Sequence, residues 1–336
     1  MPVTELGRHG PMVSRLGLGC LSMSGSYGPR PADDSEAIAT IQRALDLGMN
    51  LLDTGDMYGA GHNEELVGRA IRGRRSEAFI STKFGNRWDA TGRPLFQDGR
   101  QVVDGRPEYA REACEASLRR LQVEVIDLYC LHRVDPNVPI EETVGGMSRL
   151  VSAGWVRHLG LSEAGAQTLR RAAATAPIAA LQTEYSLWWR EPELQLIPTC
   201  RELGIAYVAY APLGRGMLTG HVASLDVLDP SDNRRNHPRF QGENLSKNLT
   251  LVDHVRDFAT RHSWTPAQVG LAWVLAKGRD IIPIPGARQR PHLEENAAAA
   301  ELKLSLEEVG ELDSVFAIGV GAGARYPERD LSAVDI

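Results

Sequence analysis

Short apolar runs alternate with longer amphipathic stretches from residue 16 to residue 304 of the chain. The apolar runs are too short for helices and are apolar on both faces, which is typical of parallel strands covered by helices. The amphipathic stretches repeat apolar positions three and four residues apart, as in Ile38, Ile41 and Leu45. This pattern predicts eight strands, at residues 16–20, 50–53, 78–82, 125–131, 156–161, 180–183, 206–210 and 281–284.

Each predicted strand is followed by helical sequence. The helices are expected at residues 33–48, 64–71, 107–121, 140–154, 169–176, 193–203, 251–261, 266–276 and around residue 293. A short hairpin at residues 4–6 and 12–14 precedes them, and long polar loops at 84–106 and 214–244 interrupt the alternation. Eight strand–helix units predict an α/β fold of the TIM-barrel type, a (β/α)8 barrel with its long loops on the C-terminal face.

A single domain over residues 1–336 is expected, because no low-complexity linker divides the chain. The stretch 318–336, rich in glycine and charge, is expected to be a loop-like or partly disordered tail. A hydrophobic content of 43% and a charged content of 24% are ordinary for a globular protein. The formal net charge is −6 at pH 7, which offers no electrostatic reason to expect nucleic acid or an anionic membrane as a partner.

No uncharged apolar run approaches the roughly 18 residues of a membrane helix, and the N-terminus lacks the apolar stretch of a signal peptide. The four cysteines lie far apart without a CxxC pair, so we expect free thiols and a cytoplasmic protein. The expected partner is a small molecule, and the oligomeric state stays open.

Polar residues of complementary chemistry stand at the ends of neighbouring predicted strands. Asp53 ends the second strand, with Tyr58 shortly after it, and Lys83 and His132 follow the third and fourth. Strand ends of a barrel meet on its C-terminal face, so these four side chains are expected to converge. Each residue alone is more often a turn, surface or structural group. Their common placement favours a catalytic role.

The four residue types fit the reduction of a carbonyl group. A tyrosine hydroxyl has an ordinary pKa near 10, and an adjacent ammonium group favours its ionised form. A carboxylate can hold that ammonium group in place. A histidine can donate a hydrogen bond to a carbonyl oxygen on which charge develops. We therefore expect Tyr58 to be the proton donor, supported by Lys83, Asp53 and His132.

The motifs that carry these residues resemble those of the aldo-keto reductase superfamily. They are Asn-Leu-Leu-Asp-Thr-Gly-Asp-Met-Tyr-Gly at 50–59, Asn-Glu-Glu-Leu-Val-Gly-Arg-Ala at 63–70, Ile-Ser-Thr-Lys-Phe at 80–84 and Ile-Asp-Leu-Tyr-Cys-Leu-His at 126–132. The resemblance extends from residue 16 to about 296. It implies a (β/α)8 barrel, NADPH as coenzyme, reduction of aldehydes or ketones, and a tetrad of Asp53, Tyr58, Lys83 and His132.

The resemblance also implies a coenzyme site at the later strand ends. Ser162 and Gln182 match positions that hold the nicotinamide carboxamide, and Tyr210 matches the ring that stacks on the nicotinamide. Glu163 stands where many relatives have asparagine, and its carboxylate can accept a hydrogen bond from the carboxamide. The positions matched to the phosphates and the adenine are Leu213, Gly214 and Arg215, then Gly286, Arg288 and His292, then Glu295 and Asn296.

Three tryptophans and two rival functions complete the prediction. The loops expected over the same rim contain Trp88, Trp188 and Trp189. For each of these tryptophans, contact with the substrate and packing in the core stay equally open. No metal is expected, and no Gly-x-Gly-x-x-Gly follows the first strand. The alternatives are a coenzyme-binding regulatory or redox-sensing subunit, resembling potassium-channel β subunits, and a barrel lyase or isomerase that uses Lys83 as a Schiff base.

Overall fold

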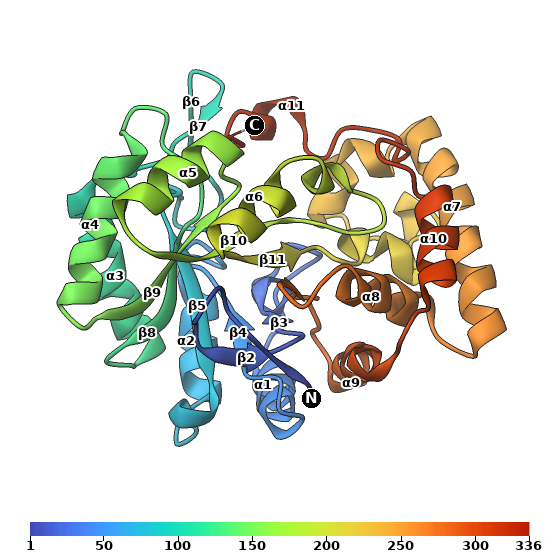
Figure 1. Ribbon diagram of the computed structural model, residues 1–336, viewed down its shortest axis with the longest axis horizontal. Coiled ribbons are helices and arrows are strands. Elements are labelled where there is room, and N and C mark those ends of the chain that lie inside the picture. Colours follow the sequence, from blue (N-terminus) through green and yellow to red (C-terminus); the bar gives the residue numbers. More distant parts are fainter. Residues whose placement is uncertain (336) are drawn as a thin grey trace.

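A single parallel sheet organises the computed structural model, which describes residues 1–335 (Figure 1). Its eight strands are hydrogen-bonded in the order β12-β11-β10-β9-β8-β5-β4-β3. Their bounds are β3 (Leu18–Gly19), β4 (Leu51–Asp53), β5 (Phe79–Phe84), β8 (Ile126–Leu131), β9 (Val156–Ser162), β10 (Ile178–Glu184), β11 (Ala206–Tyr210) and β12 (Ile281–Pro283). Neighbours in this order are neighbours in sequence, apart from the small hairpin between β5 and β8.

The sheet closes between its first and last strands. The amide of Gly17 donates to the Pro283 carbonyl at 2.9 Å, and the amide of Gly19 donates to the Pro285 carbonyl at 3.1 Å. Gly19 also forms a parallel bridge with Gly286. A Cβ atom at position 19 would lie 2.9 Å from the Ile284 carbonyl oxygen, so only glycine lets the two strands approach this closely. The fold is the predicted (β/α)8 barrel.

Helices follow the strands and surround the sheet (Figure 1). Their bounds are α1 (Ser35–Asp46), α2 (His62–Ala70), α3 (Pro107–Leu121), α4 (Ile140–Ser152), α5 (Ala166–Thr175), α6 (Leu196–Leu203), α7 (Gly242–His262), α8 (Pro266–Ala276) and α9 (Arg290–Ala298). Two more helices, α10 (Leu306–Val315) and α11 (Glu328–Leu331), complete the chain. Strands and helices bury a continuous apolar layer between them.

Alternate strand residues fill the inside of the barrel. Leu51, Phe79, Leu128 and Val208 belong to this inner cluster. The predicted N-terminal hairpin, β1 (Val3–Glu5) and β2 (Met12–Ser14), supplies Leu6 and Val13 to the same cluster. The barrel is therefore a packed core rather than a channel, and its free rim for chemistry is at the C-terminal ends of the strands.

Several segments carry more regular structure than predicted. The loop before α3 contains a hairpin, β6 (Phe96–Gln97) with β7 (Arg100–Gln101), and α7 begins well before the predicted residue 251. Helix α10 was not predicted, and within it only Leu312 is fully buried. Its start nevertheless carries a capping box, in which Ser305 and Glu308 satisfy each other's backbone amides. That Ser-x-x-Glu spacing was the available signal.

The C-terminal stretch, expected to be loop-like or partly disordered, returns to the barrel rim and forms α11 (Figure 1). The Asp335 side chain accepts a hydrogen bond from the Gly165 amide at 3.0 Å, and the Asp335 amide donates to the Glu163 carbonyl at 3.2 Å. Arg325 is 5% exposed. The last residue of the predicted tail, Ile336, lies outside the described residues. Residues 325–335 therefore cover the strand ends.

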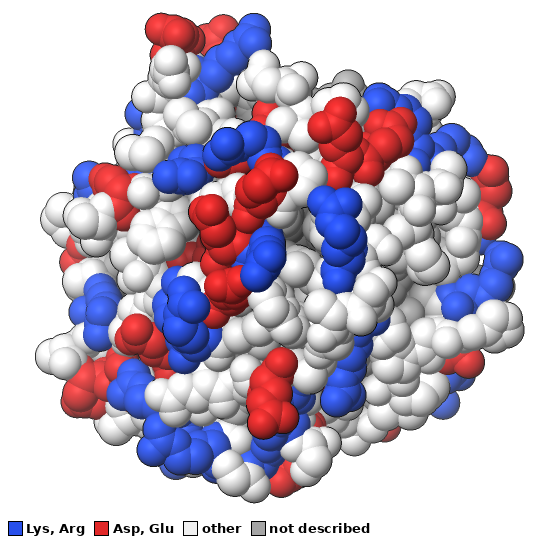
Figure 2. Space-filling model, turned by 90° about the vertical axis from the view of Figure 1, so that its left-hand side faces the viewer, with Lys and Arg blue, Asp and Glu red and all other residues white. Residues whose placement is uncertain are grey.

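The surface carries charges of both signs. On the face that Figure 2 shows, acidic and basic side chains are interspersed, without one continuous basic field. Within residues 1–335, no helix is long and apolar enough to cross a membrane.

Candidate active site

Lys83 and Asp53 form a buried ion pair at the ends of β5 and β4. The Lys83 Nζ atom lies 2.7 Å from Asp53 Oδ2, and it also donates to the Thr54 carbonyl at 2.7 Å. Asp53 Oδ1 accepts hydrogen bonds from Gln182 Nε2 at 2.7 Å and from Ser81 Oγ at 3.2 Å. Burial alone would lower the pKa of Lys83, but the charges of Asp53 and Tyr58 outweigh burial and raise that pKa. Lys83 therefore stays an ammonium ion.

Tyr58 lies over this pair, with its ring centroid 5.0 Å from Lys83 Nζ. A Cβ atom on Gly55 would lie 3.2 Å from the Tyr58 ring, so a glycine at position 55 leaves room for the ring. We expected Lys83 to dominate the pKa of Tyr58. Burial instead raises the pKa of Tyr58 above its ordinary value, and the nearby Lys83 charge offsets only part of that rise. The hydroxyl therefore keeps its proton at neutral pH.

His132 follows β8 and faces Tyr58 edge to face, with ring centroids 5.8 Å apart. Burial and the charges of Arg133 and Lys83 hold the pKa of His132 well below its ordinary range, so its imidazole is neutral. Within residues 1–335, its buried Nδ1 atom has no hydrogen-bond partner. A neutral imidazole with an unsatisfied nitrogen fits a site that receives a polar ligand.

The four predicted catalytic residues are thus brought together at one rim. The arrangement holds a protonated tyrosine, a fixed ammonium group and a neutral imidazole within one small region. It can donate a proton to a carbonyl oxygen and stabilise negative charge on that oxygen. A neutral amine, which a Schiff base requires, is opposed by the raised pKa of Lys83.

The residues matched to the nicotinamide lie at the next strand ends. Ser162 ends β9, and its Oγ atom accepts a hydrogen bond from Arg133 Nη1 at 3.4 Å. The side-chain amide of Gln182 donates a hydrogen bond to Asp53 Oδ1. The Tyr210 hydroxyl, at the end of β11, donates to Glu163 Oε1 at 2.8 Å and shares a 2.6 Å hydrogen bond with the Tyr326 hydroxyl.

Glu163 differs most from the expectation. We expected a free carboxylate that could accept from the coenzyme, but Arg325 of the C-terminal segment pairs with both of its oxygens. Its backbone φ of 54° lies in the left-handed region, which a glutamate seldom adopts. No local motif predicted this pair, because Arg325 lies in the glycine- and charge-rich stretch expected to be loop-like or partly disordered.

The segment matched to the pyrophosphate forms a tight turn after β11. Gly214, Arg215 and Gly216 all have positive φ, at 57°, 58° and 89°. The Arg215 guanidinium donates to Glu184 Oε2 at 3.0 Å, and Leu213 is buried. A Cβ atom on Gly214 would lie 2.8 Å from the Trp188 ring, so glycine is required there.

The segment matched to the adenosine lies around the start of α9. Gly286 bridges β3, and a Cβ atom there would make ordinary contacts with Ser22 Oγ at 3.5 Å and the Gly19 carbonyl at 3.6 Å. Arg288 is half-buried, and its Nη2 atom donates to the carbonyls of Tyr27 at 2.6 Å and Gly25 at 3.2 Å. His292 is exposed and Asn296 is buried. The Glu295 carbonyl accepts from Gln268 at 3.4 Å, and this residue is half-buried.

The three tryptophans divide between core and rim. Trp188 is 4% exposed and donates to Asn248 Oδ1 at 3.1 Å, so of its two predicted roles it has that of core packing. Trp189 stays partly exposed, with the guanidinium groups of Arg239 and Arg325 each 5.1 Å from its ring. Trp88 is half-buried, and its backbone forms an antiparallel bridge with Pro94 in the loop before α3.

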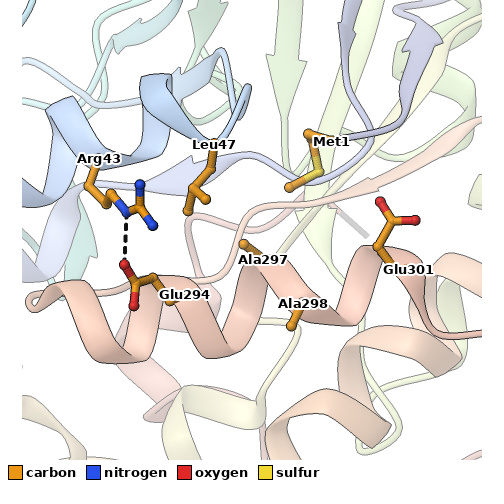
Figure 3. Close-up of a pocket in the computed structure, with 7 residues that line it drawn as sticks. All are labelled: Met1, Arg43, Leu47, Glu294, Ala297, Ala298 and Glu301. Atoms are coloured by element: carbon orange, nitrogen blue, oxygen red, sulfur yellow. Dashed lines mark hydrogen bonds and ion pairs between the residues drawn. The ribbon is translucent and has the colours of Figure 1, made fainter.

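A separate hollow lies outside the barrel rim. It has a volume of about 340 Å³ and is lined by residues of α1 and α9, with Met1 at one end (Figure 3). Arg43 and Glu294 close its other end through a 2.8 Å ion pair. Its apolar residues and this surface pair carry no catalytic chemistry. Among residues 1–335, no group of three or more His, Cys, Asp or Glu side chains is arranged to hold a metal ion.

Several known proteins are similar to this chain in sequence and in architecture. The family model described as "Aldo/keto reductase family" matches residues 15–317. A probable aldo-keto reductase 1 from Glycine max is 44% identical over 323 residues, which are 96% of this chain and 91% of that protein.

Solved structures agree with this match. A glycerol dehydrogenase from Gluconobacter oxydans has a TM-score of 0.83 at 31% identity, covering 94% of this chain and 95% of that one. An aldo/keto reductase from Klebsiella pneumoniae, solved in complex with NADP and acetate, has a TM-score of 0.71 at 28% identity, covering 99% of both chains. The chain belongs to the aldo/keto reductase family.

Proposed function

We propose that the protein reduces an aldehyde or ketone to an alcohol with NADPH as hydride donor. The observation that carries this proposal is the protonated Tyr58, which lies over the buried Lys83–Asp53 pair and faces a neutral His132. The relative from Klebsiella pneumoniae, solved with NADP, supports the choice of coenzyme. When bound, the coenzyme would supply a hydride to the carbonyl carbon.

Each residue of the chain then has a defined task. His132 donates a hydrogen bond to the carbonyl oxygen and orients it. Tyr58 transfers its proton to the same oxygen, and the Lys83 charge stabilises the phenolate that remains. Asp53, held by Ser81 and Gln182, keeps Lys83 in place. The tetrad therefore protonates an oxygen without any metal.

Other residues of the rim would hold the coenzyme. The donor set fits a dinucleotide, since Ser162 and Gln182 carry amide-binding groups at adjacent strand ends, β9 and β10. Arg215 and Arg288 lie at two later strand ends, where they can meet phosphate groups. The oxygens of Glu163 are already paired with Arg325, so we assign the carboxamide contacts to Ser162 and Gln182.

The test is oxidation of NADPH, followed at 340 nm, against a panel of aldehydes, ketones, keto-sugars and diketones after exhaustive chelation. We expect turnover with at least one class of carbonyl compound, and no gain on adding zinc or magnesium. Activity that is lost on chelation and restored by a metal would contradict the proposal. Tight NADPH binding without turnover of any compound would favour the regulatory alternative.

A further inference from the structure

Four arginines and two glutamates gather above the strand ends. Arg215 and Arg239 both pair with the fully buried Glu184, at 3.0 and 2.9 Å. Glu163 pairs with Arg325. The remaining cation is Arg133, directly after the catalytic His132. Four guanidinium groups against two carboxylates leave the rim with an excess of positive charge.

The Glu163–Arg325 pair is closed to further partners. The side chains are 2% and 5% exposed. Glu163 Oε1 also accepts from the Tyr210 hydroxyl at 2.8 Å and from the Glu184 amide at 3.3 Å. The Arg325 guanidinium is flanked by the rings of Trp189 and Tyr326, 5.1 and 5.3 Å away. The C-terminal segment thus supplies Glu163 with a direct counter-ion.

Arg133 has no such counter-ion. Its Nη1 atom donates to the His132 carbonyl at 2.7 Å and to Ser162 Oγ at 3.4 Å. No carboxylate among residues 1–335 lies within ion-pair distance of it, although Glu163 and Asp330 of α11 lie near enough to interact with its charge. Its hydrogen bonds to the His132 carbonyl and to Ser162 place it beside the predicted catalytic histidine. A cation held at a partly buried rim without a counter-ion favours an anionic ligand.

The position of Arg133 separates its ligand from the phosphates of the coenzyme. Arg133 contacts Ser162, at the nicotinamide end of the proposed coenzyme site. The coenzyme phosphates are assigned to Arg215 and Arg288, which follow β11 and β12. An anion at Arg133 would therefore belong to the substrate.

We infer that Arg133 binds an anionic group, a carboxylate or a phosphate, on the carbonyl substrate, and that Arg325 keeps Arg133 available by neutralising Glu163. Without Arg325, the charge of Glu163 would attract Arg133, whose pKa it already raises. The planar guanidinium offers two parallel donors to either anion. This inference rests on the proposed carbonyl reduction and names its substrate class.

The first experiment compares matched substrates that differ in charge. The pairs are 4-carboxybenzaldehyde with 4-methylbenzaldehyde, and glyceraldehyde 3-phosphate with glyceraldehyde. We expect kcat/KM of the wild type to be about 10- to 100-fold higher for the anionic member of at least one pair. The pair that shows the preference tells a carboxylate from a phosphate. In Arg133→Met the ratio should fall to about one, and Arg133→Lys should keep part of it.

Arg111→Met is the matched control, because Arg111 is an exposed arginine on α3 that pairs with Glu115 and lies over the Trp155 ring, away from the proposed site. It should keep the wild-type ratio. Equal kcat/KM within both pairs, or a preference that survives in Arg133→Met, would overturn the inference. If the wild type reduces none of the four compounds nor any in the wider panel, the proposed function itself fails. The two failures are therefore distinguishable.

The second experiment tests the role of the C-terminal segment. Arg325→Leu should lower the anionic preference by about tenfold, because Glu163 then pairs with Arg133. The variant leaves a buried carboxylate without its partner and is expected to be less stable. The double variant Glu163→Gln with Arg325→Leu removes both charges and should restore the preference together with the melting temperature. A double variant that regains stability but not the preference would overturn the role of Arg325.

Discussion

Single residues at the rim owe their protonation states to their surroundings. Tyr58 and His132 both stay uncharged, because burial opposes the phenolate in one and the imidazolium in the other. Lys83 stays charged at the same depth because Asp53 lies 2.7 Å away. A proton donor, a neutral hydrogen-bond donor and a fixed cation therefore coexist within one small site. The pattern of strand ends predicted which residues meet, but not which of these effects dominates.

The role of Tyr58 is tested by Tyr58→Phe. Because positioned acid catalysis contributes about 10²–10⁴-fold, we expect kcat to fall by that factor while the Kd for NADPH stays near the wild-type value. Coenzyme fluorescence measures the Kd, and a deuterium isotope effect with labelled NADPH checks that chemistry is rate-limiting. A variant that keeps a tenth or more of kcat under those conditions would show that another group donates the proton.

Coenzyme choice is tested at Arg288. Its charge-assisted bonds to a 2′-phosphate predict that Arg288→Ala raises KM for NADPH by about 10- to 100-fold and hardly changes KM for NADH. Arg290→Ala is the control, since Arg290 is exposed and paired with Glu36 at 3.0 Å. Equal losses with both coenzymes would instead show that Arg288 acts by bracing the loop at Gly25 and Tyr27.

Secondary-structure elements followed the sequence pattern where burial and periodicity agree. All eight predicted strands are present, because an apolar run that is buried on both faces leaves a clear signal. Helix α10 and the β6–β7 hairpin lack that signal. Their formation depends on capping, turn chemistry and contacts with the rest of the molecule. The first two leave short local motifs, the Ser305–Glu308 capping box and the Asp98-Gly99 turn, in which both residues have positive φ.

Helix α8 shows what such a motif contributes. Thr265 and Gln268 form a reciprocal capping box at its start, followed by Pro266 in the first turn. We expect Thr265→Ala to lower the free energy of unfolding by about 1 kcal/mol. Thr265→Ser keeps the capping hydroxyl and should lose much less stability. Urea unfolding of the three proteins measures this difference. An unchanged midpoint for Thr265→Ala would show that tertiary packing alone sets the start of α8.

At the scale of the whole molecule, the C-terminal segment joins distant parts of the chain. Residues 321–335 contact the segment after β9, the end of β11, helix α7 and the long loop that precedes it. His237 lies in that loop, and its ring nitrogen Nδ1 forms a 3.3 Å hydrogen bond with the Arg325 carbonyl. The organisation of residues 1–336 as a single domain stays a prediction.

This junction should make stability depend on pH. Burial and the charge of Arg215 lower the pKa of His237 to about 4, against about 6.5 in the unfolded chain. Between these values the unfolded state binds more protons, so stability falls as the pH falls through that window. Melting temperatures at pH 7 and pH 5 measure the loss. It should be smaller in His237→Gln, and an equal loss in both proteins would contradict the assignment.

The order of strands and helices, the closure of the barrel and the meeting of the four predicted catalytic residues all followed from local sequence. Periodicity reports burial, and strand ends of a barrel meet on one face wherever they stand in the chain. The partners of Glu163, Arg215 and Arg133 depended on the tertiary structure, because side-chain pairing at the rim joins residues up to 162 positions apart. Only the folded chain brings Arg325 to Glu163 and leaves Arg133 without a counter-ion, since ion pairing depends on distance in space and leaves no period in the sequence.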